Sequence, residues 1–516
     1  MASVKAVVKK DTYRDSIFLM KLSVQAAKES GAETVSAMMA TARNKELFLS
    51  SGLMTPEIEA AQANDLAIAI QGSEEAAREA AELVARLLEA ETEDSASGAG
   101  EVRKPATLRQ AAKSVSGLNL ALISVAGDYA RYEAAEALQA GMDVMLYSDN
   151  IAIADELALK QLAAKKGLIV MGPDCGTAII NHTPLAFANA VKPGSVGVVG
   201  ASGTGLQEAI CLLDRLGIGI SQAYGTGGRD LKDAIGGLTF LAAIDRLANE
   251  AATKVVMLLG KPPGEATRRK IVDRVRSLGK PVFVHYMGAS DYSLETAAGM
   301  TAAHDLTELA LLTAQPFLPG AKLAGVVPRA LSRPGRLCAL FGGGTLCQEA
   351  AEIASSILPG DKASNLTVAG FKKISGRDIF PGHVFWDLGE DEFTVGRPHP
   401  MMAPDLKMER VVAALGDPAV SVVLVDLVIG YGSHPRQAEL LAEALETAAA
   451  NNRGQKSDKL VVASVCGTES DRPSRTSQIA ILNQAGVVTL PSNAMAARWA
   501  AQAAAGQQGP REKDNA

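Results

Sequence analysis

The feature that most constrains the fold is a buried strand that runs into a glycine-rich turn and then into a helix. Residues 195–210 read SVGVVGASGTGLQEAI: apolar β-branched residues come first, then a glycine turn, then apolar residues at helical spacing. The first turn of a helix has backbone N–H groups without partners, and it carries the positive end of the helix dipole. Glycines admit an anion to these groups because no Cβ stands in the way. The stretch predicts either an anion-binding loop or a plain, well-capped βα turn in an α/β fold.

A second stretch of the same design favours the anion-binding interpretation. Residues 337–350 read LCALFGGGTLCQEA, again a strand, a run of glycines, a Thr and a Gln-Glu pair. Two such units suggest two related modules, each of which presents a helix N-terminus to one ligand. Neither loop has the Gly-Lys-Ser/Thr of a P-loop, and neither spaces its glycines as a dinucleotide-binding GxGxxG. Binding of an NTP by a P-loop and binding of NAD are both poorly supported.

The composition is that of an ordinary globular protein and excludes a general nucleic-acid binder. Of the 516 residues 47% are hydrophobic, 21% are charged and only 4% are aromatic, and the formal net charge is −6 without any block of Lys or Arg. The start lacks the apolar core of a signal peptide, and no apolar run reaches the ~18 residues of a membrane span. The cysteines form no CxxC pair, which is typical of a reducing compartment and predicts no metal site. We therefore expect a cytoplasmic protein without a membrane segment.

The length predicts about three or four domains. Strand-like and helix-like segments indicate a small α+β domain at the N-terminus, and regular strand–helix alternation begins at Leu118. Residues 91–104 are polar and contain Gly and Ser, so they are the best linker candidate. The expected segments are a small domain at 1–92, sheet domains at 105–190, 192–320 and 336–502, and a disordered tail at 503–516.

Ligands of open parallel sheets bind at the carboxyl ends of the strands, so the segments that follow the predicted strands are candidate site residues. Cys175 is more plausibly a buried thiol than a nucleophile. Arg229 has the geometry to clamp a carboxylate, but it could equally pair with Asp230 or Asp233 on the surface. The predicted edge residues are Gly172, Pro173, Asp174, Cys175, Gly227, Gly228, Gly432, Ser433, Cys466, Gly467 and Thr468.

Several motifs together resemble one family. GPDCGT, KPGSVGVVGASGTGLQEA and GTGGRD, in this order, look like the alpha subunit of succinyl-CoA synthetase. Residues 336–502, with FGGGTL, a strand ending in GYGSH, and VCGTES, are similar to the carboxyl-terminal ligase domain of its beta subunit. The order of these parts behind a small N-terminal domain looks most like the FdrA family of acyl-CoA synthetase-like proteins. The resemblance implies a CoA-binding Rossmann-like domain at 105–190 and flavodoxin-like ligase domains at 192–320 and 336–502.

Two parts of the synthetases have no counterpart in the sequence. Their phosphorylated histidine lies in a Gly-His-Ala-Gly motif, whereas this chain reads SDYSLETAAGMTAAHD there and His304 comes too late. No segment resembles an ATP-grasp domain. We therefore expect that the chain alone does not phosphorylate a histidine from ATP.

The resemblance, together with the missing parts, favours a substrate that is already phosphorylated. An acyl or carbamoyl phosphate would lie between the two helix ends, whose N–H groups would hold the developing oxyanion and the departing phosphate. The family resemblance implies carbamoyl transfer between oxamate and carbamoyl phosphate in purine and allantoin breakdown, in a hetero-complex or homodimer and with no covalently bound cofactor. The alternatives are a nucleotide-dependent acyl-CoA synthetase subunit that uses CoA, and a non-catalytic anion-binding scaffold.

Under this hypothesis the glycine turns form the phosphate cradle. Arg229 and Arg397 are candidate carboxylate clamps. His434, in the turn GYGSHP, is a candidate proton donor or charge stabiliser, with a surface turn residue as the alternative. The predicted cradle consists of Ser202, Gly203, Thr204, Gly343, Gly344 and Thr345.

Overall fold

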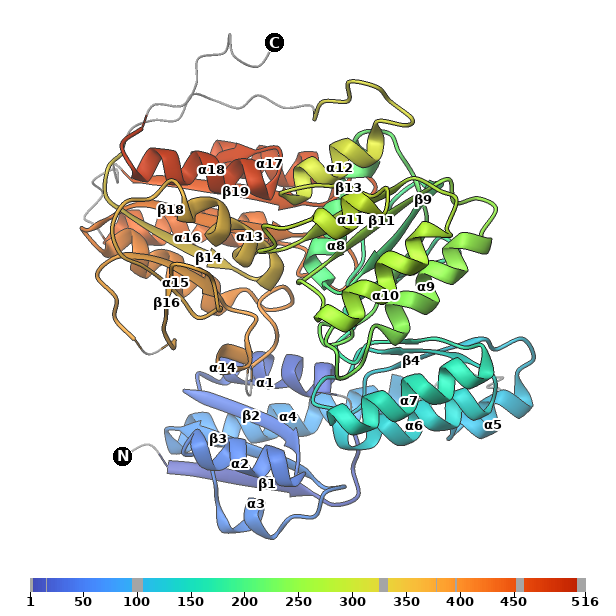
Figure 1. Ribbon diagram of the computed structural model, residues 1–516. Coiled ribbons are helices and arrows are strands. Elements are labelled where there is room, and N and C mark those ends of the chain that lie inside the picture. The colour runs from blue at the N-terminus through green and yellow to red at the C-terminus, as the bar shows by residue number, and fades with distance from the viewer. Residues whose placement is uncertain are drawn as a thin grey trace. The chain divides into compact units, whose positions relative to one another are not determined.

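The computed structural model describes residues 3–14, 16–94, 105–323, 333–376, 378–394, 397–451 and 459–507 (Figure 1). The chain forms two compact units. The N-terminal unit comprises Met1–Gly117 with the short segments Ser124–Ala126 and Thr394–Pro398, and the larger unit comprises the rest.

The N-terminal unit is built on a three-stranded antiparallel sheet, in the order β1-β3-β2. Successive side chains of β3 point to opposite faces, so that Ile68 packs on α1 and α4 while Ala67 packs on α2 and α3. The predicted α+β unit is confirmed; α2 and α3 were not predicted, because their apolar residues are too few to show a helical period. The elements are β1 (Ser3–Lys9), α1 (Ser16–Ser30), β2 (Thr34–Met39), α2 (Ala42–Ser50), α3 (Pro56–Ala60), β3 (Leu66–Gly72), α4 (Glu74–Asp94) and α5 (Leu108–Ser114).

Helix α4 enters the predicted linker at 91–104, because it continues to Asp94. The linker residues 95–104 lie outside the described ranges.

The larger unit begins with a three-stranded parallel sheet in the order β4-β5-β6, as the strand–helix alternation predicted. The next hairpin, β7-β8, belongs instead to the second sheet, where β7 pairs antiparallel with β10. Asn181 and His182 both have positive φ in its two-residue turn, which suits such a hairpin. Residues 177–186 therefore join the sheet that was expected to start at 192. The elements are β4 (Leu120–Ile123), α6 (Gly127–Gln139), β5 (Asp143–Leu146), α7 (Ile153–Lys166), β6 (Val170–Met171), β7 (Thr177–Ile180) and β8 (Thr183–Ala186).

The second sheet has seven strands in the order β13-β12-β11-β9-β10-β7-β8. Alternate residues of β11 separate its faces: Met257 packs toward α8 and α12, and Leu258 packs toward α9 and α10. The elements are β9 (Pro193–Gly200), α8 (Gly203–Arg215), β10 (Ile220–Gly225), α9 (Leu238–Asn249), β11 (Val255–Gly260), α10 (Glu265–Arg276), β12 (Val282–Tyr286), α11 (Ser293–Ala297), β13 (Thr301–Ala302) and α12 (Leu306–Ala314).

The third sheet also has seven strands, all parallel, in the order β16-β15-β17-β14-β18-β19-β20. Helices α13 and α18 cover one face, and α15, α16 and α17 cover the other. The elements are β14 (Arg336–Phe341), α13 (Gly344–Ser355), β15 (Lys362–Ser364), β16 (Lys372–Lys373), β17 (His383–Asp387), α14 (Asp391–Thr394), α15 (Asp405–Gly416), β18 (Val420–Val428), α16 (Gln437–Asn451), β19 (Leu460–Cys466), α17 (Arg475–Gln484), β20 (Val488–Leu490) and α18 (Asn493–Ala504).

The last helix corrects the start of the predicted disordered tail at 503–516. Ala503 and Ala504 are buried residues of α18 and pack in the core of the third sheet, so the chain is still helical there. Residues 508–516 lie outside the described part of the chain.

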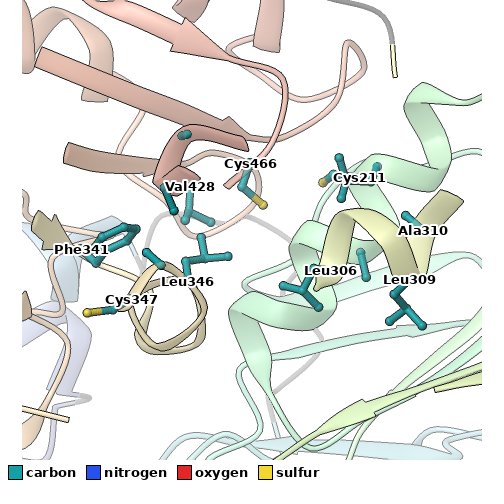
Figure 2. Packing of buried hydrophobic residues seen from close by; sticks show 14 of the residues in the cluster. Cys211, Leu306, Leu309, Ala310, Phe341, Leu346, Cys347, Val428 and Cys466 are labelled. Carbon is teal, nitrogen blue, oxygen red and sulfur yellow. The ribbon is translucent and has the colours of Figure 1, made fainter. Parts of the chain in front are cut away.

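The second and third sheets share one hydrophobic core. Helices α8 and α12 from one sheet and α13 and α18 from the other form the layer between them, and α8 contacts α13 while α12 contacts α18. Figure 2 shows Cys211 and Leu309 on one side of this layer and Leu346 and Cys466 on the other. Because a close-packed core allows little sliding, the first turns of α8 and α13 are fixed relative to each other.

The helices in the described ranges are all too short or too polar to span a bilayer.

Candidate functional site

The two glycine loops of the sequence lie in direct contact. Ser202 Oγ and Thr345 Oγ1 are hydrogen-bonded at 2.5 Å. A Cβ on Gly343 would stand 3.0 Å from Thr204 Cγ2, and a Cβ on Gly205 would stand 2.9 Å from Thr345 Cγ2. Glycine at these positions therefore allows the first turns of α8 and α13 to approach so closely. We call these two turns, residues 202–205 and 342–345, the α8 tip and the α13 tip.

The α8 tip is closed by a side-chain cap and keeps free donors. Ser202 is the N-cap, and its Oγ accepts a hydrogen bond from the Gly205 N–H at 3.1 Å. The backbone N–H groups of Gly203 and Thr204 have no hydrogen-bond partner among the described residues. Gly203 is exposed, whereas Thr204 is buried. This tip therefore keeps two N–H donors without partners in the described ranges, one at an exposed residue and one at a buried residue.

The α13 tip already binds an anion that belongs to the chain. Asp426 of β18 accepts hydrogen bonds from the N–H groups of Gly342 and Gly343, both at 2.8 Å. Lys407 of α15 forms a buried ion pair with this carboxylate, with Nζ 2.6 Å from Oδ1. The N–H of Gly343 is therefore engaged, which corrects its assignment as a phosphate donor. The donors of the tip that have no partner in the described ranges are the N–H groups of Gly344 and Thr345.

A second carboxylate, Asp387, lies against the α13 tip at the end of β17. A Cβ on Gly344 would stand 2.4 Å from Asp387 Oδ2, so only glycine fits beside it. Its Oδ1 accepts a hydrogen bond from the Gly389 N–H at 2.8 Å, whereas Oδ2 has no hydrogen-bond partner in the described part of the chain. Burial raises the pKa of Asp387 to about 7, and the nearby carboxylates of Glu390 and Asp426 act in the same direction.

His399 lies on the other side of Gly389. Its Nδ1 accepts a hydrogen bond from the Met401 N–H at 3.3 Å, so the ring proton of the neutral form is on Nε2. A Cβ on Gly389 would stand 2.6 Å from this Nε2 and 3.1 Å from Asp387 Oδ1. Burial lowers the pKa of His399 to about 4, so the ring is neutral at pH 7.

From the sequence alone, no chemical role was predicted for Asp387, His399 or Asp426. The sequence contains two weak indications of these carboxylates. Asp426 interrupts the apolar run SVVLVDLVIG, and Asp387 lies at the end of an apolar segment, two residues before Gly389. A lone carboxylate within a buried strand needs a partner, and strand ends are where ligands bind in parallel sheets.

Two of the three predicted catalytic residues, Arg229 and His434, have other partners. Arg229 donates to the Ile151 carbonyl at 2.8 Å and forms an ion pair with Glu156 Oε2 at 2.9 Å, instead of pairing with Asp230 or Asp233. The His434 N–H donates to the Met401 carbonyl, its Nδ1 accepts from the Arg436 N–H, and burial lowers its pKa. Arg397 is exposed and belongs to the N-terminal unit.

Asp230, one of the two carboxylates with which Arg229 could have paired, instead forms an ion pair with the buried Lys160. Asp230 binds Lys160 Nζ at 2.7 Å and also caps α9, because its Oδ2 accepts from the Phe240 N–H. Lys160 reaches Glu156 as well, at 2.9 Å. This buried network of α7 and the GTGGRD loop connects the first sheet to the second.

The predicted edge residues lie in two clusters that connect segments of the chain. A Cβ on Gly227 would stand 2.3 Å from the Pro173 carbonyl oxygen, which shows how closely GTGG packs on the turn formed by Gly172 and Pro173. Gly228 has open space beside it, and Asp174 is exposed. Cys175 is buried, and burial raises the pKa of its thiol to about 12, which makes it unsuited to act as a nucleophile.

The second cluster holds residues 187–190 against the third sheet. A Cβ on Gly432 would stand 2.8 Å from the Phe187 ring, and Thr468 Oγ1 donates to the Ala190 carbonyl at 2.7 Å. Cys466 is buried, and a Cβ on the adjacent Gly467 would meet the Ile429 side chain. Ser433 lies in the same turn as Gly432, half-buried.

The Gln-Glu pair that follows each glycine loop has a structural role. Glu349 of α13 accepts from the Leu306 N–H of α12 at 2.7 Å, and Glu208 of α8 accepts from the Asn493 N–H of α18 at 3.0 Å. Each glutamate therefore caps a helix that belongs to the other module. Burial raises the pKa of Glu349 to about 8.

No group of three or more His, Cys, Asp or Glu side chains in the described ranges is placed to hold a metal ion.

Three family models match the chain. The model described as CoA-ligase matches residues 340–503, and the model described as CoA binding domain matches residues 191–284. The model described as AllF, heavy metal-associated domain, matches residues 1–105. The CoA-binding match thus lies on the second sheet, whereas sequence analysis expected the CoA-binding-like domain at 105–190.

One similar protein covers nearly the whole chain, and others cover parts of it. "Uncharacterized protein YahF" of Escherichia coli strain K12 is 40% identical over 95% of this chain and 96% of that protein. The alpha subunit of an ADP-forming succinate–CoA ligase from Methanothermobacter thermautotrophicus is 27% identical, over 34% of this chain and 58% of that subunit. One solved structure that resembles the chain is the apo form of a dinucleotide-forming acetyl-coenzyme A synthetase 1 from Ca. Korarchaeum cryptofilum. The match covers 79% of this chain and 87% of the synthetase chain, with 16% sequence identity and a TM-score of 0.34. This likeness is too weak to bear on the fold.

Proposed function

Because the chain belongs to the FdrA family of acyl-CoA synthetase-like proteins, whose parts are related to CoA ligases, we propose that it transfers an acyl or carbamoyl group from an acyl or carbamoyl phosphate. The phosphate would bind between the α8 tip and the α13 tip. The observation that carries this proposal is the direct contact of the two tips through Ser202 and Thr345.

The free donors of the tips support a phosphate site. Gly203 and Thr204 supply N–H groups from the α8 tip, and Gly344 and Thr345 supply them from the α13 tip. A bound phosphate would lie beside the contact between Ser202 and Thr345, and rotation of the two hydroxyl groups would let both donate to it in place of their mutual hydrogen bond. Two helix N-termini and these hydroxyls would stabilise the charge that develops on the leaving phosphate.

The internal ion pair at the α13 tip determines which N–H donors are left for a ligand. Since Asp426 occupies the Gly342 and Gly343 donors, the ligand would meet the α13 tip only at Gly344 and Thr345. The site would therefore hold one phosphoryl group and not a longer polyphosphate. A donor with a single phosphate, such as an acyl phosphate, fits this limit.

Within this class we propose carbamoyl phosphate as the donor and oxamate as the acceptor, in a cytoplasmic complex with other subunits. The support is membership of the FdrA family together with the AllF model that matches residues 1–105. The second candidate is an acyl-CoA synthetase that uses CoA and leaves the nucleotide to a partner subunit. The CoA-ligase and CoA-binding models favour that candidate.

The full-length chain, with the subunits that copurify with it, can be assayed for phosphate release from carbamoyl phosphate. Release that depends on oxamate supports the proposal. Release that depends on CoA, with micromolar CoA binding by isothermal titration calorimetry, supports the second candidate. Binding of carbamoyl phosphate without release under either condition indicates a non-catalytic scaffold.

A pair of glycine variants tests whether the tips are the site. Gly203→Val adds bulk at the exposed α8 tip, where a Cβ would meet only Thr177 Oγ1 at 3.7 Å. We expect phosphate binding and turnover to fall at least about tenfold, because the branched side chain covers the donors. Gly416→Val is the control, since a Cβ at Gly416 meets nothing within 4 Å and this glycine lies at the end of α15. Equal turnover in the two variants would contradict the proposed site.

A further inference from the structure

Asp387 differs from the other carboxylates at the tips because one of its oxygens is unpaired. The residue is only 3% exposed, and Oδ2 lies against Gly344 without a hydrogen-bond partner in the described ranges. Asp426, at the same tip, has both oxygens bound by backbone N–H groups and one of them also by Lys407. Oδ2 is not among the buried unsatisfied atoms of the described ranges, so it keeps accessible surface and can accept a hydrogen bond or a proton from a ligand.

The backbone holds Asp387 in a fixed position. Asn365 accepts a hydrogen bond from the Asp387 N–H and donates one to the Asp387 carbonyl, both at 2.8 Å. The Gly389 N–H then fixes Oδ1, which leaves Oδ2 directed at the first turn of α13. The carboxylate is therefore pre-positioned, as a catalytic group must be.

We propose that Asp387 Oδ2 is the proton acceptor for the nucleophile that attacks the acyl or carbamoyl phosphate bound at the tips. This inference rests on the proposed function and assigns a role within it. The nucleophile is a protic group, an amide nitrogen or a thiol. Its lone pair forms a bond to the carbonyl carbon, the carbon–oxygen bond to phosphate breaks, and phosphate leaves with that electron pair. The proton of the nucleophile moves to Asp387 Oδ2 and then to solvent.

The surroundings of Asp387 suit a base that works near neutral pH. Burial raises the pKa of Asp387 to about 7, the carboxylates of Glu390 and Asp426 raise it further, and Lys261 and the Gly389 N–H oppose them. A base is most effective when its pKa lies near the working pH. His399 is neutral at that pH and adds no positive charge that would lower the pKa.

The test compares Asp387→Asn with the wild-type chain in the copurified complex. We expect the variant to bind inorganic phosphate and carbamoyl phosphate within about threefold of wild type, because the tip donors are intact. Turnover should fall about 100-fold or more, which is the usual contribution of a general base. Wild-type turnover should decline as the pH falls below about 7, and the variant should lack this decline. Asp273→Asn, at an exposed carboxylate of α10, is the control and should behave as wild type.

A second variant separates proton transfer from folding. Asp387→Ala leaves space that added formate can enter, so formate should restore part of its turnover, whereas formamide, which has a similar size but is not a base, should not. Oxamate and CoA as alternative acceptors show which nucleophile Asp387 serves. Unchanged turnover and pH dependence in Asp387→Asn would overturn the proposal, as would loss of phosphate binding together with turnover, or no rescue by formate. Wild-type protein that binds carbamoyl phosphate but never releases phosphate would instead overturn the proposed function, and this inference with it.

Discussion

The α8 tip and the α13 tip begin in the same way, with a buried strand and a glycine turn, but their backbone N–H groups meet different partners. At the α8 tip a neutral hydroxyl, Ser202 Oγ, caps the helix and leaves two donors free. At the α13 tip a buried carboxylate, Asp426, takes the first donors and is itself neutralised by Lys407. The two tips therefore differ in what remains free: the α8 tip keeps two N–H donors without partners in the described ranges, and the α13 tip is stabilised by an internal carboxylate.

This comparison predicts that the α13 tip depends most on its ion pair. Lys407→Met leaves the Asp426 charge buried without its partner, and we expect the free energy of unfolding to fall by about 3–5 kcal/mol. Urea denaturation of the full chain measures it. The double variant Lys407→Met, Asp426→Asn should recover much of this loss because the uncompensated charge is removed. A single variant that is as stable as wild type would show that the pair does not hold the tip.

Glu349, which follows the α13 tip, should make the stability of the fold depend on pH. The pKa of Glu349 is raised from 4.5 to about 8 in the folded chain, so its contribution to stability is complete below pH 4.5 and is lost as the pH rises through about 8. The loss should be on the order of 5 kcal/mol, since the pKa rises from 4.5 to about 8 and each pKa unit corresponds to about 1.4 kcal/mol. Urea denaturation at several pH values should show a smaller decline for Glu349→Gln than for wild type. An equal decline in both proteins would place the responsible group elsewhere.

Alanine substitution distinguishes the tips by the space beside each glycine. Gly344→Ala puts a Cβ 2.4 Å from Asp387 Oδ2 and should cost about 1–3 kcal/mol of unfolding free energy. Gly203→Ala has only an ordinary contact, 3.7 Å from Thr177 Oγ1, and should change the stability by about 0.5 kcal/mol or less. Thermal unfolding of the two variants provides the measurement. Similar stability of both would mean that Asp387 moves aside at no cost.

How far the sequence predicts this site depends on the range of the interactions. Local signals sufficed for the two strand–turn–helix units, because glycine runs and apolar periods are properties of neighbouring residues. They also sufficed for the contact partners Ser202 and Thr345 to be named as parts of one site. Asp426 and Asp387 come from strands that reach the tip only through sheet pairing. Their proximity to the α13 tip is a consequence of strand order, which no local pattern encodes.

The same limit explains the edge residues and Arg229. The edge residues and Arg229 were predicted as one group because each follows a predicted strand. The residues that they contact come from elements that are distant in the sequence. Arg229 pairs with Glu156 of α7, and Thr468 pairs with Ala190. The Gln-Glu repeat was visible in the sequence, yet its role depends on which helices face each other across the shared core.

The smallest expected effect comes from the contact between the tips. Ser202→Ala removes both the cap of α8 and the hydrogen bond to Thr345, and should cost about 1 kcal/mol of unfolding free energy. Thr345→Val removes only the hydrogen bond and should cost about 0.5–1 kcal/mol. If the two hydroxyls interact in solution, the double variant should lose less unfolding free energy than the two single variants lose together. A double-mutant cycle by urea denaturation measures this coupling. Strict additivity would mean that the tips touch without interacting. Added phosphate should reduce the coupling, because each hydroxyl would then donate to the ligand and no longer to its neighbour.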